Sequence, residues 1–381
     1  MGIWVFLGLI VLGWLWWQIY QPLDPDSDFF PPRAIPPATN VPPAQPSAQP
    51  RAAAPRSAVP PTVPRPPSPA VTNLTRPAAS KPATNTVPGP ALPAPTFRQV
   101  QNVFEAQLAL NRLGISSGSL DGAMGSQTRA ALSAFQRKEY LPVTGELDAG
   151  TKARLWLRAP PFTTYRVTFS DLGRLRPLSV TWLGKSQQDR LDYETVLELV
   201  AEMGHAYPNF IRRLNPSIDW ANVPAGTAIT LPNTAMPPVR SKAARVRIHL
   251  AAKSLEAFDQ EDKLLAHFPC SIARRVEKRP AGVLRVAVVA ANPNYRFDPK
   301  IFPESEEGRR LGRTLMLPPG PNNPVGVAWI GLDKPGYGIH GTPSPEAVGR
   351  TESHGCFRLA NWNAEYLLKL AWVGMPVDVE P

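Results

Sequence analysis

The distribution of proline is the feature that most limits where this chain can fold. The sequence has 381 residues and 47 prolines, and 23 of these prolines lie between residues 21 and 97. That stretch consists mainly of Pro, Ala, Thr and Ser, so it has too little apolar surface to offset the entropy cost of ordering it. We therefore predict a disordered linker over residues 21–97. The folded part begins near residue 98 and is long enough for more than one core.

The first 20 residues differ from the linker because they are apolar. MGIWVFLGLIVLGWLWWQIY contains no charged side chain and is long enough to cross a bilayer as a helix. Three tryptophans and a tyrosine gather at its C-terminal end, as in an interfacial aromatic belt. No small-residue cleavage site follows the apolar run. We predict an uncleaved anchor over residues 1–20 in the cytoplasmic (inner) membrane. The folded part would then lie in the periplasmic or extracytoplasmic part of the cell envelope.

The net charge of +11 does not indicate a nucleic-acid partner. Six basic residues lie between residues 31 and 97, where no Asp or Glu occurs, and no basic run alternates with aromatic residues. Nucleic-acid-binding surfaces concentrate both residue types. Attraction to an anionic wall or membrane surface explains the positive charge as well as nucleic-acid binding does.

Residues 98–158 have the apolar spacing of helices, with a turn at Asp121-Gly122 and a short third helix expected over residues 151–157. The ordered motifs LG, DG, G-x-x-T, FQ, TG-x-L and T-x-x-x-L resemble the three-helix peptidoglycan-binding domain. The resemblance implies binding of glycan or stem peptide, with Asp121, Gly122 and Gln136 as predicted contacts. Most of the matching positions also suit a structural role, because glycines allow turns.

Residues 162–234 are predicted to form a small α+β unit. We expect strands over residues 164–168 and 227–231, and helices over residues 193–203 and 210–214. FIRRLNPSIDWANVPAGTAITLPN resembles the second half of a LysM module, which binds glycans. The first half has a long insertion and lacks the Gly-Asp-Thr of that pattern. Glycan binding and a spacer role therefore both stay open.

Residues 244–381 are predicted to be mostly β. ARVRIHLAAKSLEAF and GVLRVAVVA are rich in β-branched residues and alternate in the manner of strands. Only residues 364–371 have a clear helical pattern. Residues 296–320 form a long charged loop, which is either a lid over a site or a solvated insertion.

Residues 337–361, YGIHGTPSPEAVGRTESHGCFRLAN, contain two of the five histidines and one of the two cysteines. His354 lies two residues before Cys356, so an extended segment would place both side chains on one face. A base beside a thiol favours the nucleophilic thiolate. Gly355 allows backbone N–H groups to approach a substrate as oxyanion donors. His340, sixteen residues before Cys356, must be brought in by the fold.

The alternative for this motif is a purely structural role, with a buried cysteine beside a hydrogen-bonded histidine. We predict no metal, because no second cysteine lies nearby and Glu352 is the only near carboxylate. Two cysteines are also too few for a disulfide-stabilised scaffold. One bridge is possible, but it would consume the thiol of Cys356, so we expect two free thiols, with Cys270 as a small buried residue. The remaining histidines, His205, His249 and His267, are expected to be structural or exposed.

The strings HGT and SHGCFRL, at the spacing found here, resemble the L,D-transpeptidase (YkuD-type) family. The resemblance extends upstream through KRPAGVLRV, ANPNY and NPVGVAWIGL, so it covers nearly all of residues 244–381. It implies a β-sandwich-like catalytic domain that needs no cofactor. The chain is thus predicted to be multidomain, with this domain preceded by a small all-α domain and a small α+β domain.

The resemblance implies acyl transfer on peptidoglycan stem peptides. Cys356 would attack the carbonyl of the third stem residue and release D-alanine, and an amine of a neighbouring stem would then form a 3–3 cross-link. His340 is the predicted general base, His354 an orienting or polarising residue, and the N–H groups of Gly355 and Cys356 the oxyanion donors. Predicted contacts to the donor stem are Tyr337, Gly341, Ser353 and Arg358, the last being suited to a carboxylate.

Several alternatives stay open at this point. Arg358 can instead hold the loop by a salt bridge, and Tyr337 can pack beside the site. Water or a protein amine can replace the stem amine as acceptor. A non-enzymatic tether between membrane and peptidoglycan is the alternative of another class.

Overall fold

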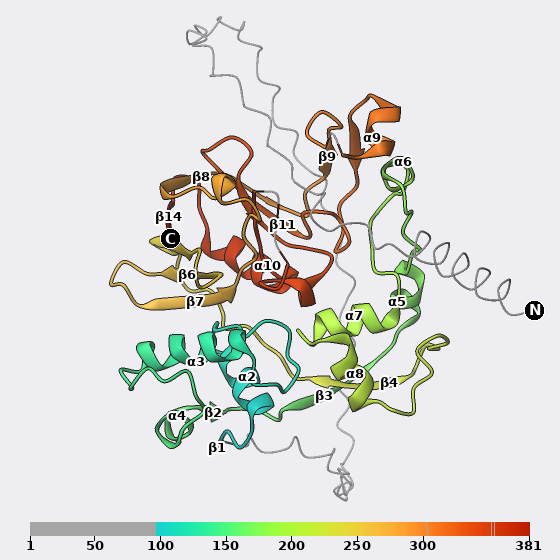
Figure 1. Ribbon diagram of the computed structural model, residues 1–381. Coiled ribbons are helices and arrows are strands. Elements are labelled where there is room, and N and C mark those ends of the chain that lie inside the picture. Colours follow the sequence, from blue (N-terminus) through green and yellow to red (C-terminus); the bar gives the residue numbers. More distant parts are fainter. Residues whose placement is uncertain (1–96, 303, 352, 354) are drawn as a thin grey trace, which may run out of the picture. The chain divides into compact units, whose positions relative to one another are not determined.

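The computed structural model describes residues 97–381 except residues 303, 352 and 354 (Figure 1). The predicted anchor over residues 1–20 and nearly all of the predicted linker therefore lie outside the described residues. His354 lies outside them as well. Among the residues that the structure describes, none of the helices combines the length and apolar composition that a bilayer crossing requires.

Residues 98–158, the helical module, contain three helices closed by a short strand pair. The elements are β1 (Arg98–Gln99), α2 (Val103–Asn111), α3 (Ser126–Lys138), α4 (Ala149–Arg154) and β2 (Trp156–Leu157). Helix α2 begins where the Asn102 side chain accepts a hydrogen bond from the Glu105 N–H. The predicted third helix is wrong in its second half, because Trp156 and Leu157 pair with β1 as a strand.

Residues 162–234, the middle segment, combine one antiparallel strand pair with four short helices. The elements are β3 (Phe162–Arg166), α5 (Phe169–Arg174), α6 (Trp182–Ser186), α7 (Val196–Met203), α8 (Pro208–Leu214) and β4 (Ala228–Pro232). Strand β3 pairs with β4, so both predicted strands are confirmed with ends shifted by one or two residues. The predicted helices correspond to α7 and α8. The insertion contains α5 and α6, which are too short to give a periodic pattern.

The helical module and the middle segment share one hydrophobic core. Phe104 of α2 stacks on Phe162 of β3 with ring centroids 4.9 Å apart. Phe210 of α8 lies 5.0 Å from the same Phe104 ring. Two segments with separate sequence patterns therefore pack their aromatic residues against each other, and Phe104 and Phe210 are buried.

Residues 244–381, the C-terminal segment, are built on one large sheet. Its strands are β5 (Arg245–His249), β6 (Ser254–Phe258), β7 (Leu264–Pro269), β8 (Gly282–Ala291), β11 (Ala328–Leu332), β12 (Gly338–His340), β13 (Phe357–Arg358) and β14 (Pro376–Glu380). Within the described residues the order is β13-β12-β11-β8-β14-β5-β6-β7. The β12–β13 and β14–β5 pairs are parallel and the others are antiparallel.

Helix α10 (Asn361–Leu370) packs on this sheet, in agreement with the predicted mostly-β class. Leu367 and Leu370 of α10 lie in a buried cluster with Val246 of β5 and Val377 of β14. The run ARVRIHLAAKSLEAF forms two paired strands, and Lys253 adopts a left-handed conformation with φ 48° in the turn between them. Two 3₁₀ turns complete the segment, η2 (Val276–Lys278) and η3 (Pro345–Ala347).

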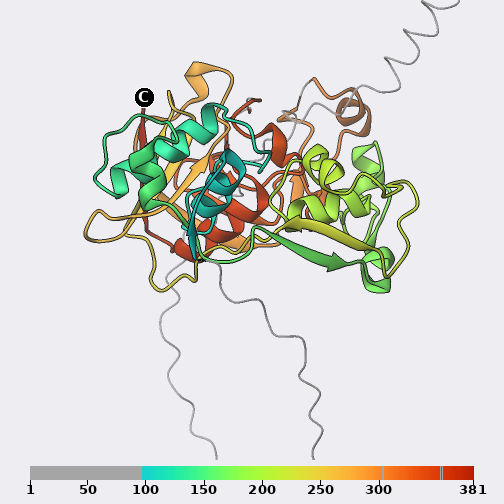
Figure 2. The ribbon, with the colours of Figure 1, turned by 90° about the horizontal axis from the view of Figure 1, so that it is seen from below.

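The predicted charged loop over residues 296–320 contains nearly all of a flap, which we define as residues 295–317 without residue 303. It consists of β9 (Tyr295–Phe297), α9 (Glu306–Leu311) and β10 (Leu315–Leu317), and β9 pairs with β10. Helix α6 of the middle segment contacts β10 and lies next to this flap (Figure 1), and Figure 2 shows the same segments from below. The flap adds its own apolar cluster to the site side of the sheet.

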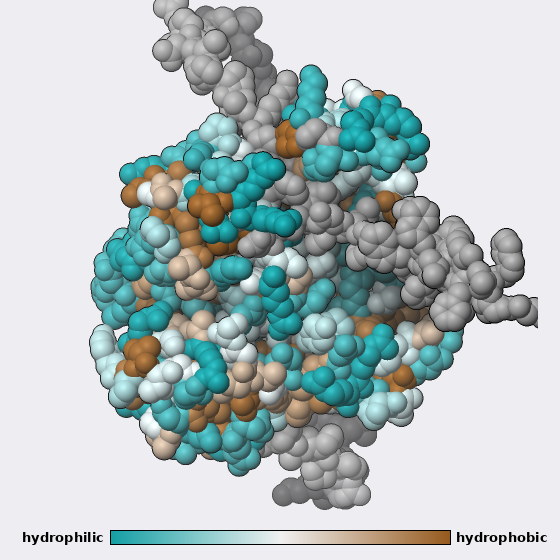
Figure 3. Space-filling model, viewed as in Figure 1, coloured by the Kyte–Doolittle hydropathy of each residue, from teal (hydrophilic) through white to brown (hydrophobic). Residues whose placement is uncertain are grey.

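The surface gives no sign of a large apolar docking face on the side in view. The face shown in Figure 3 is mainly hydrophilic, and its apolar side chains form small separate patches. Scattered exposed apolar residues of this kind are ordinary on a folded protein.

Candidate active site

Cys356 and His340 are brought together by two neighbouring parallel strands. His340 is the last residue of β12, and Cys356 directly precedes β13. In the register of this pair, His340 lies opposite Arg358. The thiol of Cys356 donates to the Gly336 carbonyl over 3.6 Å, and the Gly338 N–H donates to the sulfur. The edge of the sheet thus holds the thiol beside the turn that leads into β12.

The ring of His340 is held in one tautomer. Its Nδ1 lies 2.6 Å from the Gly341 carbonyl oxygen, and a carbonyl can only accept, so Nδ1 carries the hydrogen. Nε2 is then the basic nitrogen of the neutral ring. Trp329 stacks on the ring with centroids 5.7 Å apart. Burial lowers the pKa of His340 to about 3. The imidazole is therefore neutral near pH 7, which is the state that accepts a proton.

The thiol of Cys356 is also in its neutral form. Only 2% of the residue is exposed, and burial raises the pKa of Cys356 to about 12. The Gly338 N–H and the charge of Arg358 act in the opposite direction but do not offset burial. Cys356 belongs to the same apolar cluster as Phe297 of the flap and Trp182 of α6. The described conformation is thus closed over a protonated thiol, which must lose its proton to a base as it attacks.

A second strand-like contact fixes the turn around Cys356. Ser271 and Arg358 exchange two backbone hydrogen bonds of 2.9 and 3.0 Å. Ser353 donates its N–H to the Ile272 carbonyl, and its Oγ donates to the Cys356 carbonyl over 2.5 Å. Ser353 is buried, so in this conformation its hydroxyl holds the turn.

Arg358 lies inside the protein rather than on its surface. It is 5% exposed, and its Nη2 donates to the Thr351 hydroxyl over 3.1 Å. Its positive charge acts on both reactive groups, lowering the pKa of Cys356 and of His340. The guanidinium therefore favours thiolate and neutral imidazole together.

Asn361, which was not among the predicted site residues, holds the loop that follows His340. Its Oδ1 accepts hydrogen bonds from the N–H groups of Thr342 and Val327, at 3.1 and 3.3 Å. A Cβ added at Gly341 would overlap this oxygen. Gly341 therefore has a packing role here, beside its predicted contact with substrate. The only sequence signal for Asn361 is its position at the start of a helix directly after the cysteine motif.

The other predicted residues around the thiol lie in different settings. Tyr337 is half-buried next to Cys356, and burial raises its pKa. Lys334 places its ammonium 4.9 Å from the centre of the Tyr337 ring. Gly355 is buried. The catalytic and substrate-binding roles of these residues stay predictions.

In the helical module, Gln136 is fully buried and fixes a loop. Its Nε2 donates to the Thr144 and Thr151 hydroxyls, and its Oε1 accepts from two backbone N–H groups. Asp121 accepts a hydrogen bond from Gln107 over 2.9 Å, and Gly122 has a φ of 78°. In this conformation the Gln136 side chain shapes the module and presents no surface to a ligand.

The remaining thiol and histidines have structural surroundings. Cys270 is free and fully buried, as predicted, and burial raises its pKa. His249 and His267 both contact Glu256, and His205 stacks on Trp362. Among the described residues, no group of three His, Cys, Asp or Glu side chains could hold a metal ion.

Comparisons with known proteins identify two parts of the chain. Residues 243–379 match the family model described as "L,D-transpeptidase catalytic domain". Residues 99–155 match the one described as "Putative peptidoglycan binding domain". The "Putative L,D-transpeptidase YkuD" of Bacillus licheniformis is 24% identical over 49% of this chain and 93% of that protein. The "Putative L,D-transpeptidase YqjB" of Bacillus subtilis is 32% identical over 31% of this chain and 60% of that protein.

Solved structures give similar matches. An L,D-transpeptidase from Mycobacterium smegmatis is 17% identical, with 43% of this chain and 80% of that chain covered and a TM-score of 0.29. The Enterococcus faecium enzyme is 16% identical, with 37% and 50% covered and a TM-score of 0.27. The sequence comparisons support an L,D-transpeptidase catalytic domain, a peptidoglycan-binding domain and hence an enzyme of the cell envelope that acts on peptidoglycan.

Proposed function

We propose that this chain is an L,D-transpeptidase that forms 3–3 cross-links between peptidoglycan stem peptides through a thioester on Cys356. The observation that carries the proposal is that a neutral imidazole ends β12 while a buried thiol directly precedes β13, the strand that pairs with β12. A neutral base can take the thiol proton at the moment of attack, so the thiolate does not have to form before the substrate binds.

The first half-reaction forms the acyl-enzyme. His340 Nε2 takes the proton of Cys356, and the sulfur attacks the carbonyl carbon of the third stem residue. The C–N bond to D-alanine breaks, and the leaving amine takes the proton from His340. The N–H groups of Gly355 and Cys356 are the proposed oxyanion donors, and His354 is proposed to orient or polarise the site.

The second half-reaction returns the enzyme to its starting state. An amine of a neighbouring stem attacks the thioester carbonyl, and His340 takes its proton. The C–S bond breaks, the new amide forms, and the proton of His340 restores the thiol. The buried charge of Arg358 would stabilise the thiolate in both steps. Tyr337, Gly341 and Ser353 complete the proposed donor site.

The other segments are proposed to place this reaction at the wall. Residues 1–20 would anchor the chain in the cytoplasmic membrane, and residues 21–97 would let the folded part reach the peptidoglycan. The middle segment keeps its LysM-like resemblance, and glycan binding by it stays a prediction. Asp121 and Gly122 remain the proposed glycan contacts of the helical module.

The test is to incubate the full-length chain in detergent with a tetrapeptide-stem muropeptide and follow the product masses. We expect loss of one alanine together with dimer formation. Loss of alanine without dimers would replace the stem amine by water as the acceptor. A Cys356→Ala variant should give no product, whereas Cys270→Ala should behave as wild type. Products from Cys356→Ala would refute the mechanism, and absence of a carbapenem adduct on Cys356 would count against it.

A further inference from the structure

We propose that helix α7 of the middle segment positions the loop of the general base, through hydrogen bonds that Glu198 and Glu202 accept from two asparagines of the C-terminal segment. The inference rests on the proposed function and adds positioning residues to it. The two glutamates are four residues apart, so they lie on the same face of α7.

The first contact joins Glu202 to Asn361. Asn361 is 1% exposed, and its Nδ2 donates to Glu202 Oε2 over 3.2 Å and to the Pro321 carbonyl over 3.1 Å. Its Oδ1 holds the N–H groups of Thr342 and Val327. Every polar atom of this buried amide is therefore used, and one of its partners comes from outside the C-terminal segment. A buried N–H that loses its acceptor is costly, and this cost favours a turn or shift of the amide toward another partner.

The second contact joins Glu198 to Asn322. Asn322 Nδ2 donates to Glu198 Oε1 over 2.5 Å and to the Asp192 carbonyl over 3.1 Å. The same stretch of the middle segment is also joined to the C-terminal segment through its backbone. The Leu191 N–H donates to the Pro319 carbonyl, and the Leu191 carbonyl accepts from the Asn322 N–H.

Both contacts act on residues 318–327, the segment that packs against the loop after His340. A Cβ at Gly326 would overlap Asn361 Oδ1 and would lie 2.7 Å from Thr342 N. Gly326 therefore lies directly against residues 341 and 342, with no room for a side chain between them. Movement of residues 318–327 would shift the carbonyl of Gly341, which fixes the tautomer of His340.

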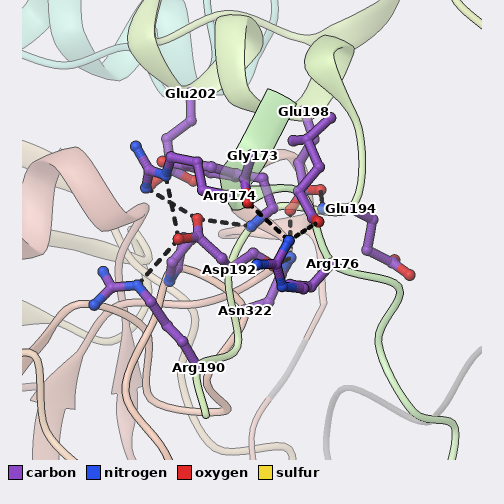
Figure 4. A network of polar contacts seen from close by, with 12 residues as sticks. Gly173, Arg174, Arg176, Arg190, Asp192, Glu194, Glu198, Glu202 and Asn322 are labelled. Carbon is purple, nitrogen blue, oxygen red and sulfur yellow. Dashed lines mark hydrogen bonds and ion pairs between the residues drawn. The ribbon is translucent and has the colours of Figure 1, made fainter. Parts of the chain in front are cut away.

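The middle segment is itself joined by several polar contacts at this point. Figure 4 shows Glu198, Glu202, Asp192 and Asn322 in one polar network. Buried Asp192 pairs with two arginines, at 2.9 Å to Arg174 and 3.1 Å to Arg190. The ion pair with Arg174 joins the segment that carries the contacts to α5.

The protonation state of Glu202 decides which substitutions test its hydrogen bond to Asn361, and glutamine and alanine form a matched pair. Burial raises the pKa of Glu202 to about 8, and the negative charges of Glu198 and Glu365 add to this. Hydrogen bonds from Asn361 and Tyr193 act against the rise. The group is thus mainly a neutral acid at pH 7, and glutamine copies its shape, its charge and its accepting oxygen. Alanine removes the acceptor.

The experiment compares Glu202→Ala, Glu202→Gln and Met203→Ala in the full-length chain, with kcat and KM measured on a tetrapeptide stem. Met203 is the next residue of α7 and is exposed, so it controls for truncation of a side chain on this helix. We expect Glu202→Ala to lower kcat by about 10- to 100-fold with little change in KM, because a small misplacement of a catalytic group has effects of this size. Glu202→Gln and Met203→Ala should stay within a few-fold of wild type.

Two results would overturn the proposal. One is a wild-type kcat for Glu202→Ala with only a lower melting temperature, which would make Glu202 merely structural. The other is an equal loss for Glu202→Gln and Glu202→Ala, which would exclude the accepting oxygen as the cause.

A substrate-free measurement separates this proposal from the proposed function. If the wild-type chain turns over no stem, the function is wrong, and the variants are then compared by the His340-dependent alkylation of Cys356. We expect slower alkylation in Glu202→Ala but not in Glu202→Gln. Equal alkylation rates in Glu202→Ala and Glu202→Gln would refute the positioning role, whatever the reaction of the enzyme is.

Discussion

A single methyl group added at Gly341 is the most direct test of how the loop after His340 is held. In Gly341→Ala the new Cβ would overlap Asn361 Oδ1 and would lie 3.3 Å from the Cα of Gly326. Asn361 cannot retreat freely, because both ends of its amide are hydrogen-bonded and the residue is 1% exposed. The methyl must therefore displace the Asn361 amide or the loop itself.

The cost follows from the hydrogen bonds that depend on Oδ1. Its displacement leaves the N–H groups of Thr342 and Val327 without their acceptor. Each such loss costs about 1–3 kcal/mol, so we expect a destabilisation of roughly 2–6 kcal/mol. Urea unfolding followed by fluorescence measures this difference, and kcat should fall with it, because His340 is the adjacent residue.

A matched control and a double variant make the test strict. Gly173→Ala adds a methyl with no atom within 4 Å, inside α5, and should leave stability equal or up to about 1 kcal/mol higher. In an Asn361→Ala background the methyl at Gly341 has room, so its cost should largely disappear. If Gly341→Ala is as stable as wild type, or if the costs of Gly341→Ala and Asn361→Ala simply add, the steric argument is wrong.

Three further outcomes are expected. Because the pKa of Cys356 is raised to about 12, its alkylation by iodoacetamide should keep rising through pH 10, with Cys270 unlabelled; a plateau below pH 9 would contradict this. Burial acts to raise the pKa of Glu256, but hydrogen bonds from His249 and His267 outweigh burial and lower the pKa. The ionised Glu256 therefore stabilises the fold fully above its unfolded pKa of about 4.5, and this stabilisation is lost as the pH falls toward the lowered pKa of the folded state. Glu256→Gln should therefore lose about 3–5 kcal/mol at pH 7 and flatten the acid side of a melting-temperature profile, and an unchanged profile would exclude this role. Trp182→Ala should loosen the flap and speed both proteolysis within residues 295–317 and alkylation of Cys356; unchanged rates would show that α6 does not hold the flap closed.

The chemistry of the site is predictable from the sequence because it is carried by a local motif. Cys356 with its flanking glycine and histidine predicts a nucleophile, and the upstream HGT string predicts a partner. The parallel pairing of β12 with β13 is not predicted, because the sequence shows only that the fold must bring His340 to this segment. What the motif cannot predict is that both groups are buried and neutral, since burial depends on how the flap packs.

The contacts that hold the site come from far away in the sequence and leave no local signal. Glu202 and Asn361 are 159 residues apart, and neither lies in a motif that requires the other. Helices α6 and α9 have five and six residues, which is too short for a periodic pattern. Gln136 shows the same limit inside a motif, since the motif predicts a peptidoglycan contact there and does not predict that the side chain is fully buried.

The stacking of Phe104 on Phe162 has a consequence for how such chains arise. A domain that carries its own core can be gained, lost or exchanged between genes without harm to its neighbours. Here Phe104 and Phe210 come from different segments and complete one core. A recombination event that replaced the helical module alone would leave aromatic residues of the middle segment facing water. Residues 98–234 are therefore expected to be inherited as one block, and swapping either half between relatives should yield insoluble chains.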